Sequence, residues 1–139
     1  MNNFTKIDCY CIKLRRAANI VSDIYDHCLD SMGLSITQYS LLGNLQKIES
    51  CSVTDLANYI GLERTTVVRT IRPLFSKGMI SDASAPNQRN KILQLTEKGE
   101  KILEQCKILW RDAQEEVERR IGKENADMLM KILDQINDG

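Results

Sequence analysis

The feature that most constrains this chain is a pair of short helical segments separated by a glycine. Ser52 lies three residues before Asp55, which is close to the spacing of a helix-capping box. The apolar residues of the first segment lie on one helical face: Val53, Leu56, Ala57 and Ile60. Gly61 predicts a tight turn, and a second helix then begins near Glu63 with its own apolar stripe: Val67, Ile71 and Leu74. Two short helices joined by a glycine-containing turn form the helix-turn-helix pattern.

The spacing of apolar residues changes after the second of these helices. Residues 79–83 and residues 91–96 are short segments with apolar and β-favouring side chains, which predicts two strands. The polar segment between them, residues 84–90, contains proline and asparagine and is typical of a hairpin loop. A hairpin that directly follows a helix-turn-helix is a wing. We therefore predict a winged helix-turn-helix lobe over residues 35–96.

Amphipathic helices are predicted on both sides of this lobe. Apolar residues recur at helical spacing over residues 9–31 and over residues 97–137, with one glycine break in the second range. A shorter helix over residues 37–47, capped by Thr37, opens the lobe. The predicted fold class is mainly α with a small β-wing, in a single domain of residues 1–139. The flanking helices carry more apolar surface than one chain can bury, so we predict that they form a homodimer.

Composition narrows the class of protein further. The chain has 139 residues, of which 42% are hydrophobic and 27% charged, as in one ordinary globular domain. No apolar run approaches the ~20 residues of a membrane span, so we expect no membrane partner. Residues 1–8 lack the basic segment and apolar core of a signal peptide. The five cysteines are irregularly spaced, which argues against a secreted disulfide framework and favours a cytoplasmic protein.

The net charge is zero, but the charges are unevenly distributed. Residues 53–96 carry a net charge of +3, whereas residues 97–139 carry −3. Burial of the stripe on the second helix leaves six residues facing outward: Arg64, Thr65, Thr66, Val68, Arg69 and Arg72. Arginine pairs with guanine, and threonine offers a hydroxyl or a methyl group to base edges. A merely solvated helix face usually carries lysine and glutamate, so we predict that this face contacts double-stranded DNA.

Several segments occur in an order that resembles the MarR family of winged helix-turn-helix repressors. These segments are Leu14–Ala18, Leu34–Tyr39, Asp55–Ala57, Thr65–Arg69, Lys77–Ile80 and Leu95–Gly99. The resemblance covers nearly the whole chain, from Cys9 to Ile136. It implies a homodimer in which the first helix and the last two pack against the partner, while each recognition helix enters a major groove of a palindromic operator.

The resemblance also implies a role for the wing. Family wings often carry an aspartate two residues before an arginine that enters the minor groove. In this chain the pair is Asn87 and Arg89, so the arginine is present without an acidic partner. The residues predicted to contact DNA are therefore Arg64, Thr65, Thr66, Arg69, Asn87, Arg89 and Lys91.

Regulators of this family usually release DNA when a small phenolic or amphipathic effector binds between the dimerisation helices and the DNA lobe. Arg16 matches an arginine of the family's first helix. Two roles are open for it: contact with an anionic effector, or pairing with an acidic residue across the dimer. The resemblance favours effector-controlled repression as the function.

A second mode of control is thiol oxidation. Cys11 falls where the hydroperoxide-sensing subgroup of the family carries its reactive cysteine, and Tyr25 matches one of the two tyrosines that approach that thiol from the partner. The second tyrosine position is Ile36, so the match is partial. A cysteine that simply packs in the core is the alternative.

The sequence gives less support to other classes of protein. A winged helix that binds protein instead of DNA would favour acidic or apolar residues on the outer face of the recognition helix. The chain has no metal-ligand spacing, phosphate loop or nucleophile motif, so we predict a protein that is not an enzyme and has no metal or cofactor.

Overall fold

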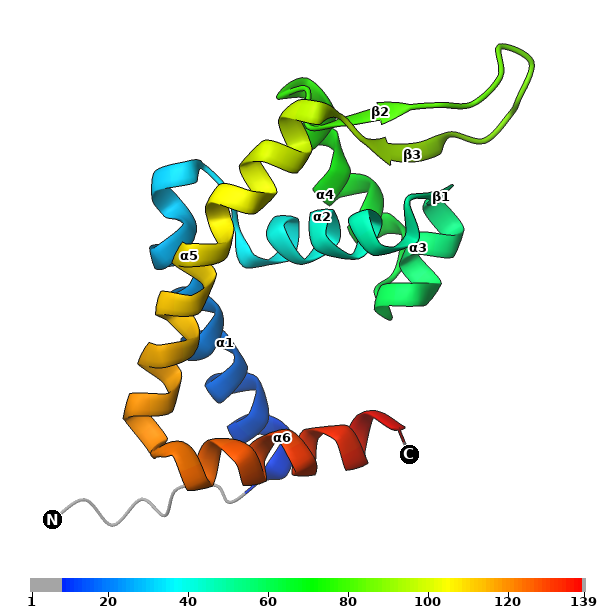
Figure 1. The fold of residues 1–139 in the computed structure, drawn as a ribbon. Coiled ribbons are helices and arrows are strands. Elements are labelled where there is room, and N and C mark those ends of the chain that lie inside the picture. Colours follow the sequence, from blue (N-terminus) through cyan, green and yellow to red (C-terminus); the bar gives the residue numbers. More distant parts are fainter. Residues whose placement is uncertain (1–8, 139) are drawn as a thin grey trace, which may run out of the picture.

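The computed structural model describes residues 9–138; residues 1–8, which carry the prediction about a signal peptide, lie outside this range. Within it, six helices and three short strands form a lobe and a helical arm (Figure 1). The fold class predicted from the sequence, mainly α with a small β-wing, is confirmed. None of the helices in this range is long and apolar enough to cross a membrane.

The arm consists of α1 (Tyr10–Leu29), α5 (Glu97–Ile121) and α6 (Lys123–Asp138). α1 packs along α5. α6 leaves the end of α5 at a sharp angle and runs across the bottom of the view in Figure 1. Gly122, with a φ of 86°, makes this change of direction in a backbone region that favours glycine. A 3₁₀ turn, η1 (Asp30–Met32), follows α1 and leads into the lobe.

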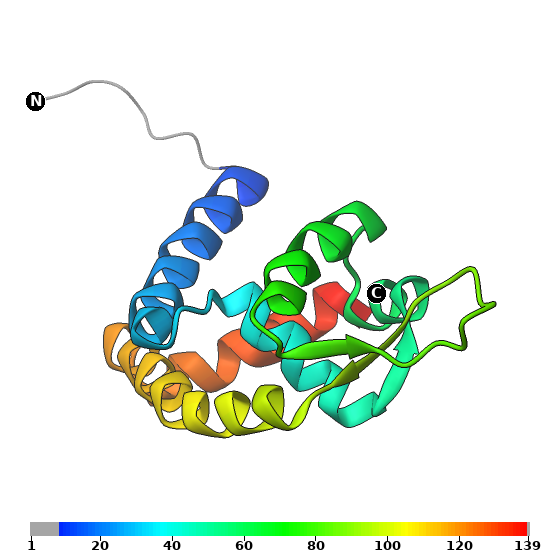
Figure 2. The ribbon, with the colours of Figure 1, turned by 90° about the horizontal axis from the view of Figure 1, so that it is seen from above.

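The lobe consists of three helices and a three-stranded antiparallel sheet. The helices are α2 (Ile36–Ile48), α3 (Val53–Ile60) and α4 (Arg64–Ser76). The strands, in the spatial order β1-β3-β2, are β1 (Ser50–Ser52), β3 (Ile92–Leu95) and β2 (Ile80–Asp82). The helix-turn-helix and the hairpin are confirmed, and the wing projects beyond the lobe in both ribbon views (Figures 1 and 2). β1 was not predicted, because a strand of three residues is too short to show alternation.

The start of α2 corrects one prediction. Its cap is Ser35 and not Thr37: the Ser35 hydroxyl accepts a hydrogen bond from the Gln38 N–H at 3.1 Å. The Ser35 N–H donates in return to Gln38 Oε1 at 3.0 Å, which completes a capping box. Only Ser35 has a glutamine three residues later, and this reciprocal pair decides where the helix begins. The predicted cap of α3 is confirmed, since Ser52 Oγ accepts from the Asp55 N–H at 3.1 Å.

The core lies where α2 meets the other elements of the lobe and the first half of α5. Its fully buried side chains are mostly leucines: Leu29, Leu41, Leu42, Leu45, Leu56, Leu74, Leu93 and Leu103. No polar or charged residue among those described is buried. The lobe is thus held together by apolar packing, and its polar residues remain on the surface.

The lobe and the arm meet at a tight joint. Thr96 Oγ1 accepts from the Gly99 N–H at 3.0 Å and donates to the Gly78 carbonyl at 2.5 Å, while the Thr96 N–H donates to the Met79 carbonyl at 3.1 Å. A Cβ atom at Gly99 would lie 2.1 Å from that carbonyl oxygen, so only glycine allows α5 to approach this closely. The first turn of α5 is therefore fixed against the backbone that follows α4.

Candidate nucleic-acid interface

α4 presents a polar face to solvent. Val67, Ile71 and Leu74 are buried as predicted, with exposures of 0%, 4% and 0%. Four of the six residues expected to face outward are exposed: Arg64, Thr65, Arg69 and Arg72. Thr66 is half-buried. Val68 is also half-buried and packs against the core, because it lies at the edge of the buried stripe.

The wing is organised by one carboxylate at the end of β2. Asp82 Oδ1 accepts hydrogen bonds from the Ser84 N–H at 2.9 Å and from the Ile92 N–H at 3.1 Å. The same carboxylate thus joins the two sides of the hairpin where the loop begins. These hydrogen bonds with Ser84 and Ile92 hold the pKa of the exposed Asp82 carboxyl below its ordinary value.

The tip of the wing is a turn closed on itself. The Gln88 N–H donates to the Ala85 carbonyl at 2.9 Å, and the Ala85 N–H donates to Gln88 Oε1 at 2.7 Å. This turn exposes Asn87 at the tip and places Arg89 directly after it, also exposed. The hydrogen bonds that shape the tip are therefore those of Ala85 and Gln88, and Asn87 lies beside them.

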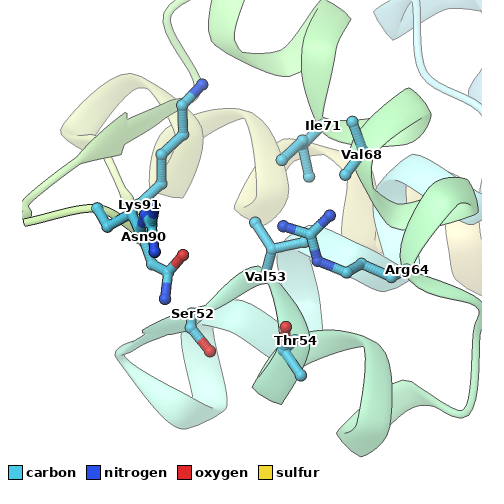
Figure 3. A pocket seen from close by; sticks show the side chains of 9 residues that line it. Ser52, Val53, Thr54, Arg64, Val68, Ile71, Asn90 and Lys91 are labelled. Atoms are coloured by element: carbon cyan, nitrogen blue, oxygen red, sulfur yellow. The ribbon is translucent and has the colours of Figure 1, made fainter.

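At its base the wing packs against α4. Lys91 Nζ lies 4.9 Å from the centre of the Phe75 ring, within range of a cation–π contact. Arg64 and Arg89 line one groove of about 300 Å³ between the start of α3, α4 and the wing. Figure 3 shows Arg64 reaching from α4 towards Val53, with Asn90 on the wing side. Arg64 and Arg89, which the sequence analysis predicted to contact DNA from two separate segments, thus lie on the same surface.

The other predicted site residues lie on the arm. Cys11 and Arg16 are exposed on α1. Tyr25 is half-buried, and its hydroxyl donates to Gln114 Oε1 of α5 in the same chain. Burial raises the pKa of the Tyr25 phenol above its ordinary value, and the nearby Glu118 carboxylate adds to the rise. The Tyr25 hydroxyl is therefore already engaged within its own protomer.

No group of three or more His, Cys, Asp and Glu side chains over residues 9–138 is arranged to hold a metal ion. Cys51 and Cys106 are buried, and burial raises the pKa of both thiols. Neither is therefore an activated thiolate.

Comparison with known proteins decides the family. Residues 34–90, which contain most of the lobe, match the model of the MarR family. The transcriptional regulator MosR of M. tuberculosis, solved in complex with DNA, is 31% identical; the match covers 94% of this chain and 97% of that one, with a TM-score of 0.77. This chain belongs to the MarR family.

Two further structures agree with the family fold. The transcriptional repressor CouR, bound to a 23-mer DNA duplex, is 26% identical over 97% of this chain and 99% of its own, with a TM-score of 0.84. Apo MarR from E. coli is 18% identical, with a TM-score of 0.76 over 94% of this chain and 98% of that chain, and supports the fold alone. The match spans both the lobe and the arm in each case.

Asp82, whose carboxylate organises the wing, is not identified in the sequence analysis. The available signal is its position: an aspartate at the end of a predicted strand, two residues before a serine, commonly forms a side-chain turn to the backbone. In this member of the MarR family the wing's acidic residue lies at its base, where it binds backbone.

We expect Asp82→Ala to loosen the wing while the helical core stays folded. The amides of Ser84 and Ile92 lose their acceptor, so their hydrogen-exchange protection should fall, and Asp82→Asn should lie between Ala and wild type because its amide oxygen still accepts. Folding lowers the pKa of Asp82 in the wild-type protein. The stability that these hydrogen bonds contribute is therefore fully present above the ordinary aspartate pKa of about 4. It is lost as the pH falls through the pKa of Asp82 in the folded protein. Unchanged protection of both amides in Asp82→Ala would contradict this role.

Proposed function

We propose that this MarR-family chain is a sequence-specific DNA-binding transcriptional regulator. In this proposal it is a repressor that binds a palindromic operator as a homodimer and leaves it when a small effector binds. The observation that carries the proposal is the convergence of Arg64 from α4 and Arg89 from the wing on one groove beside an exposed polar helix face. The DNA complexes of MosR and CouR support it.

The exposed face of α4 is proposed to enter the major groove. Arg69 and Arg64 supply bidentate donors for guanine, and Thr65 and Thr66 offer hydroxyl and methyl groups. Arg89, Asn87 and Lys91 of the wing are proposed to contact the adjacent minor groove or its phosphates. Base contacts would set the sequence preference, and phosphate contacts would set the position of the lobe on the duplex.

The homodimer is supported by apolar surface on the arm that the single chain leaves uncovered. The large hydrophobic residues exposed on α1 are Tyr10, Ile12, Leu14 and Ile20. Those exposed on α6 are Met128, Leu129, Met130, Ile132 and Ile136. No side chain described on α6 is buried. A helix with an apolar face and no partner in its own chain is best covered by a second copy, and a two-fold dimer matches a palindromic site.

The effector is proposed to bind between α2 of the lobe and α5 of the arm. A groove of about 440 Å³ lies there, and the Tyr39 and Trp110 rings stack beside it with centres 6.4 Å apart and an angle of 22°. Lys47 and Lys107 also line it, so an aromatic compound with an acidic group fits its chemistry. Arg16 lies outside this groove in the protomer, and its proposed contact with an effector requires the partner subunit.

A regulator of this kind is proposed to work in the cytoplasm and to catalyse no reaction. The support is the family and the character of the surface just described: a polar helix face, a basic wing and an open aromatic groove. The alternative control, oxidation of Cys11, has the exposure of that thiol in its favour. The Tyr25–Gln114 bond counts against it, because it occupies the hydroxyl that the partner's thiol would need.

The DNA contact is tested by alanine variants of α4 on a duplex selected from a random library by the wild-type protein. Arg69→Ala should weaken binding to that duplex by about 1–3 kcal/mol if Arg69 pairs bidentately with a base. Arg111→Ala on α5 is the matched control, since Arg111 is exposed on the arm and should have no effect. Fluorescence anisotropy measures both. Unchanged affinity for Arg69→Ala and Arg64→Ala alike would show that this face of α4 does not contact DNA, whereas failure of the wild-type protein to select any duplex would leave a winged helix that binds protein as the better account.

The effector groove is tested with the chain's single tryptophan, Trp110. Aromatic carboxylates should quench its fluorescence and release the protein from DNA over the same concentration range. Tyr39→Ala should weaken both effects, because it removes one wall of the groove. Release by an organic hydroperoxide that is abolished in Cys11→Ser, without any response to aromatic acids, would instead establish thiol control.

A further inference from the structure

One residue of the lobe has a backbone conformation that an ordinary side chain disfavours. Glu49, at the end of α2, has a φ of 78° and a ψ of −55°. Among the residues that the structure describes, it is the only one besides glycines with a positive φ. These angles are close to those of a type of γ-turn that is rare and strained in proteins. The strain arises because the Cβ atom of an L residue crowds the backbone at positive φ, a conflict that glycine avoids.

The side chain of Glu49 does nothing to offset this strain. It is exposed, and within residues 9–138 it has no hydrogen-bond or ion-pair partner. The Glu49 N–H, in contrast, donates to the Leu45 carbonyl at 2.8 Å and ends the last turn of α2, in which Leu45 is fully buried. A strained residue of this kind persists only where the structure on both sides of it is held in place. On the α2 side, buried apolar packing holds it.

The segment on the other side of Glu49 is fixed to the wing. β1 pairs with β3, with Cys51 opposite Leu93 and Ser52 opposite Ile92 (Figure 1). Cys51 is 8% exposed, and the Ser52 hydroxyl then caps α3. β3 is also the strand that pairs with β2, so it is the middle strand of the sheet. The position of the wing is therefore tied, through β1, to the backbone at Glu49.

Glu49 also lies between the two grooves described above. Gln46 and Lys47, in the last turn of α2, line the groove proposed for the effector. Ser52 and Thr54, which follow Glu49 closely in the chain, line the groove between α3, α4 and the wing. A movement of the last turn of α2 thus reaches β1 and the wing through this one strained residue.

We propose that Glu49 is a strained hinge that passes movement of the last turn of α2 to the wing. The strain favours a second arrangement, in which Glu49 returns to a negative φ and β1 and the wing change direction relative to α4. A ligand that contacts Gln46 and Lys47 selects this second arrangement by binding it more tightly. The ligand step rests on the proposed effector groove, whereas the strain and its link to the wing do not.

Two substitutions separate the strain from the loss of the side chain. Glu49→Gly and Glu49→Ala both remove the carboxylate, and they differ only in the Cβ atom that causes the strain. Glu49→Gly should melt about 3 °C above Glu49→Ala, because relief of the strain exceeds the extra entropy that glycine gives the unfolded chain. At an unstrained position glycine would lower the Tm instead. A Tm of Glu49→Gly at or below that of Glu49→Ala would overturn the proposal.

Hydrogen exchange without ligand tests the link to the wing. Glu49→Gly favours the arrangement in which β1 is paired with β3, so the amides that join these strands should exchange about fivefold more slowly than in Glu49→Ala. The amides of α6, which lies in the arm, should exchange at the same rate in both variants. Equal exchange at β1 and β3 in the two variants would show that Glu49 is strained but is not a hinge for the wing.

Release from the selected duplex tests the ligand step, with 2-naphthoate as an aromatic carboxylate. Glu49→Gly should need about fivefold more 2-naphthoate for half-release than Glu49→Ala, because it stabilises the arrangement that the ligand must displace. Equal midpoints would overturn the ligand step. Failure of 2-naphthoate to quench Trp110 or to release either variant would count against the effector groove alone, since the Tm and the exchange rates still decide whether Glu49 is a hinge.

Discussion

The rest of the structure depends on the contact between the first turn of α5 and the backbone at Met79. Gly99 allows α5 to approach that carbonyl, and Thr96 ties the same turn to Gly78 and Met79. On the other side of the joint, Lys77 Nζ donates to the Gly33 carbonyl at 2.8 Å, between η1 and α2. The end of α4 is therefore joined both to the helix that leaves the lobe and to the segment that enters it. An element that fixes the position of the arm therefore also fixes the direction of α4.

This arrangement separates the chain's surfaces by chemistry. Apolar side chains fill the lobe and remain exposed on α1 and α6, whereas α4 and the wing carry more basic than acidic residues. The zero net charge of the chain is thus divided between an acidic arm and a basic lobe. A dimer joined through the arm would present two basic lobes held at one spacing, and the rigid joint would make that spacing sensitive to a ligand bound between α2 and α5.

The elements with strong local patterns could be predicted from the sequence. The stripe of Val67, Ile71 and Leu74 predicted α4, and the turn at Gly61 predicted its relation to α3. The sequence did not reveal β1, because its three residues are recognisable as a strand only by their pairing with β3. The choice of Ser35 over Thr37 depended on a reciprocal bond with Gln38, which a scan for single capping residues misses.

Only part of the candidate DNA-binding site could be predicted, because its residues come together from distant segments. Arginines on one helix face can be seen in a sequence, but a groove is built from segments that lie far apart in it. Thr37 and Thr70 line one groove, and Ser52 and Asn90 line the other. Tyr25 meets Gln114 across 89 residues, so its engagement within the chain was equally hidden. The family resemblance predicted that these segments belong to one lobe, but it did not indicate which of their side chains lie close together.

We propose that two copies of this chain place their two α4 helices on one duplex. Sedimentation equilibrium measures it directly, with the protein alone at micromolar concentration and then with a labelled duplex selected by the protein. We expect twice the mass of one chain without DNA, and a complex of two chains with one duplex. A stable, folded monomer under the same conditions, binding the duplex as a single chain, would contradict it.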